Sequence, residues 1–119
     1  MINMNSVHLI GKITLDPKIR ELKSGTKLAE IGIGIPESFR KENGEWETRM
    51  QFVDVVVWEK QAEQIEKSFK KGDGILVEGS LQFDSWEKDG QRRSRLRVRG
   101  QRIQPVQLPQ YKQEYKKAS

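Results

Sequence analysis

The chain of 119 residues contains no cysteine, one histidine and no long apolar run. Without cysteine it can form neither a disulfide nor a thiolate metal site. His8 lies within an apolar segment, where a structural or exposed role is more common than metal ligation. The apolar stretches are too short for a transmembrane helix, and the first five residues lack the basic and apolar regions of a signal peptide. We therefore expect a cytoplasmic protein that does not enter a membrane.

Patterns typical of catalysis and of cofactor binding are also missing. Carboxylates are plentiful, but none has the spacing of a two-metal site or of an acid–base pair. The Gly72-Asp73-Gly74 segment lacks the lysine and hydroxyl residues of a phosphate-binding loop and predicts a turn. We expect no enzymatic activity, no metal and no cofactor.

The chain does contain a concentrated positive charge. Its net charge is +5, with 34% hydrophobic and 33% charged residues. Residues 88–102 hold seven basic side chains and one acid, whereas residues 1–87 hold 12 basic and 15 acidic side chains. A mildly acidic body with one strongly basic segment predicts a polyanionic partner.

Short runs rich in apolar and β-branched residues predict five strands. These lie at residues 6–16, 28–36, 47–57, 75–86 and 92–105. Residues 18–23 are expected to form a short polar connection. Asn43-Gly44 and Asp89-Gly90 have the composition of hairpin turns.

Residues 60–71 predict one short helix instead, because Ala62, Ile65 and Phe69 recur at helical spacing and Gly72 is placed to cap its end. The order of elements indicates a mainly β fold: a five-stranded Greek-key barrel with one short α-helix between strands 3 and 4, which is the oligonucleotide-binding (OB) architecture. We expect this domain to span residues 1–105 and to be followed by a flexible basic tail at 106–119.

The last predicted strand has alternating arginines. The two-residue period places Arg93, Arg95, Arg97 and Arg99 on one face and directs Leu96 and Val98 toward the core. Neighbouring like charges repel each other, and a phosphate backbone would relieve that repulsion. The alternative is a merely soluble outer face, although such faces usually mix both signs of charge.

Aromatic residues form the second pattern. Proteins that bind single strands without sequence preference combine a basic groove with aromatic rings on which bases stack. Four rings are candidates for this role: Phe39, Phe52, Trp58 and Trp86. Trp46 lies at the base of the first hairpin, and Phe69 and Phe83 are expected in the core. Core positions are also an alternative for Phe52 and Trp58. In the second strand, Gly32 and Gly34 are expected to leave a flat surface that a ligand can approach closely.

At this point the sequence resembles the bacterial single-stranded DNA-binding protein family over about residues 5–106. The resemblance rests on NSVHLIGKITLDPKIR, PESFRKENGEWETR, FVDVVVWEKQAEQIEKSFKKGDGILVEGSL and the hairpin of residues 86–102. It implies that Phe39 and Phe52 occupy positions where many members have tryptophan. Trp58 replaces a usual phenylalanine, and Trp86 matches a tryptophan directly.

The resemblance also bears on assembly. Members typically form homotetramers, which implies a homo-oligomer here, with a dimer as the alternative. Val53 stands where many members have a histidine implicated in subunit contacts. The family usually ends in an acidic tip that recruits replication and repair enzymes, whereas this chain ends in the basic QYKQEYKKAS. We therefore do not expect recruitment of repair proteins through the tail.

Together these features predict sequence-tolerant binding and protection of single-stranded DNA in replication, recombination or repair, at the nucleoid. Besides the four aromatic platforms, the expected phosphate ligands are Lys88, Arg92, Arg93, Arg95, Arg97, Arg99, Arg40 and Arg49. The alternatives are a single-stranded RNA-binding or primosome-type OB protein and a structural OB subunit that binds a protein partner. A metal-dependent nuclease on the same fold is more remote.

Overall fold

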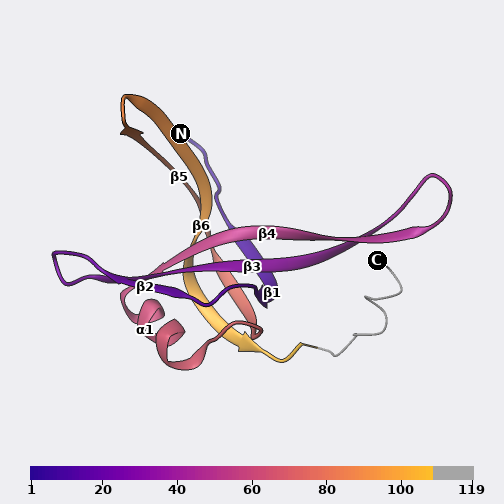
Figure 1. The fold of residues 1–119 in the computed structure, drawn as a ribbon, viewed down its shortest axis with the longest axis horizontal. Helices are drawn as coiled ribbons and strands as arrows, with labels where there is room; N and C mark the ends of the chain where they lie inside the picture. Colours follow the sequence, from indigo (N-terminus) through magenta and orange to yellow (C-terminus); the bar gives the residue numbers. More distant parts are fainter. Residues whose placement is uncertain (109–119) are drawn as a thin grey trace.

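A computed structural model describes residues 1–108, which form six strands and one helix (Figure 1). The elements are β1 (Val7–Ile13), β2 (Lys18–Glu21), β3 (Lys27–Arg40), β4 (Trp46–Trp58), α1 (Glu59–Ser68), β5 (Gly74–Lys88) and β6 (Gln91–Val106). Within this part of the chain no helix is long and apolar enough to cross a membrane.

Five of the strands close into a barrel. The hydrogen-bonded order is β1-β5-β6-β4-β3, and β1 also pairs with β3, so that the sheet returns to its first strand. The pairs are antiparallel except for a short parallel contact between β4 and β6, from Val55↔Val98 to Val57↔Gly100. With α1 between the third and fourth barrel strands, the predicted fold is confirmed.

The core lies inside the barrel and under the helix. Alternation along β3 and β4 directs Ile31, Ile33, Val55 and Val57 inward, where they are buried. From below, α1 adds Ala62 and Ile65, which are also fully buried, so the helix closes one end of the barrel as expected (Figure 1).

The expected polar connection at residues 18–23 is wrong, because residues 18–21 form β2. This strand pairs with β3 from Lys18↔Glu30 to Glu21↔Lys27. Ile19 is half-buried and packs against the core cluster, which holds this side of the strand in place. The apolar anchor and the ladder of backbone hydrogen bonds outweigh the polar composition.

The predicted helix end was also wrong. The helix stops at Ser68, and extended Phe69 caps it by donating its N–H to the Ile65 carbonyl at 3.1 Å. Asp73 accounts for the early stop, because its carboxylate accepts the Lys70 N–H at 3.0 Å and so favours a turn there. Gly72, with φ +97°, belongs to that turn and donates its N–H to the Ile13 carbonyl.

Two long hairpins project from the barrel in different directions (Figure 1). The β3–β4 hairpin turns at Gly44, which has φ +88°, and the β5–β6 hairpin turns at Asp89 and Gly90, with φ +52° and +77°. Both turns lie where the sequence predicted them. Only the parts of the strands that close the barrel have a hydrophobic core behind them.

Candidate nucleic-acid interface

One side of the β5–β6 hairpin carries the predicted arginine row. Cross-strand partners project to the same side of a sheet, and the register pairs Trp86 with Arg93, Asp84 with Arg95 and Gln82 with Arg97. We call the side that carries Trp86, Arg93, Arg95, Arg97 and Arg99 the arginine face. The structure thus brings one predicted platform and four predicted phosphate ligands together.

The arginine face continues onto the outside of the barrel. Arg99 is in register with Val56 of β4, and Val56 is in register with Glu30 of β3. Alternation along β4 puts Phe52 and Trp58 on the same side as Val56. Phe52 is exposed and Trp58 is half-buried, so neither is a fully buried core residue. Three of the four predicted platforms therefore lie on one continuous surface.

Carboxylates lie within this surface and pair with its arginines. Glu30 Oε2 lies 3.2 Å from Arg95 and 3.3 Å from Arg97, while Glu30 Oε1 lies 3.2 Å from Arg20 Nε. Asp84 Oδ2 lies 3.2 Å from Arg97 Nε. The repulsion expected along the arginine row is thus already relieved within the protein, and the face mixes both signs of charge.

Asp84 is held in its charged form. The Gln82 side-chain amide donates a hydrogen bond to Asp84 and Arg97 lies beside it, so the pKa of this carboxyl is lower than its usual value. Asp84 is therefore ionised at neutral pH and remains a partner for Arg97, whose side chain is 13% exposed.

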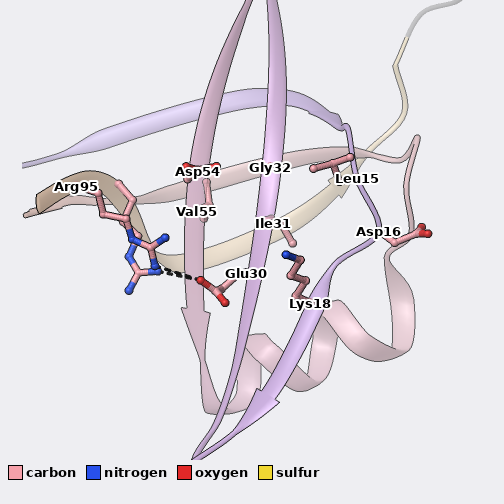
Figure 2. A pocket seen from close by; sticks show the side chains of 10 residues that line it. Leu15, Asp16, Lys18, Glu30, Ile31, Gly32, Asp54, Val55 and Arg95 are labelled. Carbon is pink, nitrogen blue, oxygen red and sulfur yellow. Dashed lines mark hydrogen bonds and ion pairs between the residues drawn. The ribbon is translucent and has the colours of Figure 1, made fainter. Parts of the chain in front are cut away.

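A pocket of about 190 Å³ opens beside these ion pairs. Figure 2 shows Arg95 joined to Glu30 on one side of it and Lys18 nearby on β2. Gly32 and Asp54, from neighbouring strands, also line the pocket. Its lining combines cations and carboxylates and lies in the middle of the surface that carries the aromatic rings.

The flat surface expected at the two glycines of β3 is found only in part. Gly32 lines the open pocket. Gly34 is covered, because a Cβ there would lie 2.8 Å from both Met50 Cε and Thr14 Cγ2 and 3.7 Å from Phe52 Cε1. These neighbouring side chains occupy the space that a side chain at Gly34 would take, so a ligand cannot approach the backbone there.

Two residues predicted to lie in the core are exposed. Phe83 is 66% exposed and Leu96 is 60% exposed, and the two are in register on the side of the β5–β6 hairpin opposite the arginine face. The two-residue alternation correctly predicted that they lie on the side opposite the arginines. However, the hairpin extends beyond the barrel there, and nothing in the described chain packs over them. Val98, closer to the barrel, is buried as predicted.

The remaining predicted residues lie further out. Lys88 is near the end of the arginine face, but Arg92 is on the opposite side of that hairpin, where its guanidinium donates to Ser85 Oγ at 3.3 Å. On the β3–β4 hairpin, Arg40 shares a side with Phe52, whereas Phe39 and Arg49 lie on the other side. The Arg49 guanidinium carbon lies 4.3 Å from the centre of the Phe39 ring and covers one of its faces.

Residues 1–108 contain no group of three or more histidine, aspartate or glutamate side chains arranged to hold a metal ion. The cations and exposed aromatic rings of this surface are groups of the kind that bind phosphates and stack bases.

The sequence is similar to those of known single-stranded DNA-binding proteins. The "Single-stranded DNA-binding protein" of Aquifex aeolicus is 35% identical over 106 residues, which are 89% of this chain and 72% of the relative. The protein of the same name from Wolinella succinogenes is 40% identical over 101 residues, which are 84% of this chain and 62% of the relative.

Solved structures of single-stranded DNA-binding proteins are similar to this one over most of the chain. A deletion variant of the single-stranded DNA binding protein from Thermus aquaticus is 32% identical, with a TM-score of 0.79 over 87% of this chain and 51% of that chain. A Plasmodium falciparum SSB in complex with ssDNA is 23% identical with a TM-score of 0.81 over 90% of this chain and 98% of that one, which shows the shared fold. Residues 4–106 match the sequence model of the Single-strand binding protein family, and the chain belongs to that family.

Proposed function

We propose that this protein binds and protects single-stranded DNA without sequence preference during replication, recombination or repair. The observation that carries the proposal is the single surface on which Phe52, Trp58 and Trp86 lie beside the arginine row of β6. Family membership supports the same function and a role in binding instead of catalysis.

The mechanism is electrostatic capture followed by stacking. The arginine face attracts the phosphate backbone over a distance, and the bases then stack on the exposed rings. Single strands are preferred because a duplex hides the faces of its bases. Arg93 and Arg99 are in none of the ion pairs that the described residues form, so they are the first phosphate ligands.

The titration of intrinsic tryptophan fluorescence tests this function. We expect oligo-dT to quench the emission of Trp58 and Trp86, and we expect the affinity to fall as salt rises, with a slope of about −0.7 per phosphate contact in a log–log plot. A duplex of equal length should quench little. If oligo-U binds more tightly than oligo-dT, the RNA-binding alternative is favoured. A flat signal with every ligand would favour the protein-scaffold alternative.

Glu30 competes with DNA for the arginines in this mechanism. Glu30→Gln is expected to tighten oligo-dT binding at low salt and to steepen the salt dependence by about 0.7, because it releases Arg95, whereas Arg97 keeps its ion pair with Asp84. Glu66→Gln is the matched control, because it removes the same charge from an exposed ion pair with Lys27, outside the arginine face. Weaker binding by Glu30→Gln would mean that the carboxylate positions the arginines instead of competing for them.

Assembly and location complete the proposal. Family membership supports a homo-oligomer, most simply a tetramer, in the bacterial cytoplasm at the nucleoid, and light scattering would give the mass. Val53 is half-buried and packs against the core, so its side chain contributes to folding of the barrel itself. Most of the predicted tail, residues 109–119, lies outside the described residues, and no recruiting role is proposed for it.

A further inference from the structure

The β3–β4 hairpin carries an apolar stripe that none of the contacts described above explains. Alternation along β4 puts Trp46, Met50 and Phe52 on one side of the hairpin, and we call these three residues the apolar stripe. They are 62%, 42% and 72% exposed. Phe52 is already a platform of the proposed site, but Trp46, beside the turn, was assigned no role from the sequence.

The cross-strand neighbours leave the stripe open. Phe52 is in register with Gly34 and Met50 with Pro36, and these partners are too small to cover a ring. Trp46 is in register with Arg40, whose Nη2 lies 3.7 Å from the Cβ position of Gly44 in the turn. By contrast, the Phe39 ring on the other side of the hairpin is covered by Arg49. The stripe therefore offers open aromatic faces with a guanidinium at its far end.

Contiguous exposed apolar side chains rimmed by polar residues can mark an interaction or ligand-binding site. Two observations identify the ligand. The stripe is continuous with Phe52 and so with the surface proposed to bind DNA, and Arg40 takes part in none of the ion pairs formed by the described residues. An aromatic ring beside an unpaired guanidinium suits a base and its phosphate.

We propose that Trp46 is an additional base-stacking platform and Arg40 its phosphate ligand, so that the single strand continues from Phe52 along the β3–β4 hairpin. This rests on the proposed function and extends its site. Phe52 lies six positions after Trp46 along β4, which corresponds to about 20 Å. At the spacing of about 3.4 Å per nucleotide of B-form DNA this length holds roughly six nucleotides, and a stretched strand needs fewer.

A variant with Trp46 as its one tryptophan tests the contact directly. The chain has three tryptophans, so the double variant Trp58→Phe, Trp86→Phe leaves Trp46 as the sole reporter and keeps aromatic rings at both other platforms. We expect long oligo-dT to quench this emission and oligo-dT of only a few nucleotides to quench it less. Unchanged emission at saturating long oligo-dT, with binding measured independently by anisotropy of the labelled DNA, would overturn the proposal.

Affinity as a function of DNA length provides the second test. Trp46→Ala is expected to weaken binding of long oligo-dT by about 5- to 140-fold and to leave the shortest binding oligo-dT almost unaffected. Trp46→Phe should restore most of the loss. Phe83→Ala is the matched control, because Phe83 is equally exposed on a hairpin but lies on the side opposite the arginine face.

The outcomes separate the two proposals. Equal losses at every length, or no loss at any length, would overturn the extension while the wild-type protein still binds DNA. A changed oligomeric mass with unchanged DNA affinity would identify the stripe as a subunit contact and would also overturn it. If the wild-type protein binds no oligo-dT, both the proposed function and its extension fail.

Discussion

Trp86→Ala is expected to weaken binding of oligo-dT by about 1–3 kcal/mol, which is the usual loss when one stacked base loses its aromatic partner. Trp86 is exposed, stands on the arginine face and is in register with Arg93. A base stacked on this ring, as proposed, would therefore have Arg93 beside it on the adjacent strand as a phosphate ligand. Equilibrium titration at fixed salt, followed by anisotropy of a labelled oligo-dT, measures the loss.

The control for this variant is again Phe83→Ala on the opposite side of the same hairpin, which should bind as the wild type does. Both positions are solvent-exposed, so thermal unfolding should change little in either variant. An equal loss of affinity in the two variants would indicate that the hairpin as a whole is perturbed. Undiminished binding by Trp86→Ala would remove this residue from the site.

Gly79→Ala is expected to destabilise the protein by about 3 kcal/mol or more, toward the upper end of the cost of overpacking. A Cβ at this position would lie next to the carbonyl oxygen of Arg99 and 2.9 Å from its carbonyl carbon. These are backbone atoms, so a side-chain rotation cannot relieve the clash. The register between β5 and β6 also shifts between Glu78 and Gly79, where the hairpin leaves the barrel.

Thermal or urea unfolding measures this loss, with Gly32→Ala as the comparison. A Cβ at Gly32 would meet Thr14 Oγ1 at 3.2 Å, a contact that a small movement of one side chain relieves. Gly79→Ala should also weaken DNA binding in the folded fraction, because any backbone shift there displaces Arg99 and the hairpin beyond it. Similar unfolding midpoints for the two variants would contradict the predicted clash between a Cβ at Gly79 and the backbone of Arg99.

Most of the fold could be predicted from the sequence because its signals are local. Alternation along β3 and β4, helical spacing of Ala62 and Ile65 and the Asn43-Gly44 turn each depend on a few neighbouring residues. The short strand β2 was missed because its stability comes from pairing with β3 and from one anchor, Ile19. The helix end was missed because Asp73 outside the helix determines it.

The candidate site was predictable in composition but not in its contacts. The two-residue period correctly put four arginines on one side of β6, yet it could not reveal Glu30, which lies 67 positions from Arg97 in the sequence and joins it only after the barrel closes. The same period separated Phe83 and Leu96 from the arginines. It could not show that this side of the hairpin lies beyond the barrel and is left uncovered.

The carboxylates of Glu30 and Asp84 have a further consequence, for the time that a strand remains bound. If Arg97 binds a phosphate as proposed, the carboxylates of Glu30 and Asp84, which lie 3.3 and 3.2 Å from its guanidinium, can pair with it again as soon as that phosphate leaves. Each partial release would then be prolonged, and a bound strand would dissociate one contact at a time. Differences in affinity between related complexes lie mostly in the dissociation rate. A strand bound in this way would be held by many contacts, each of which can be broken separately.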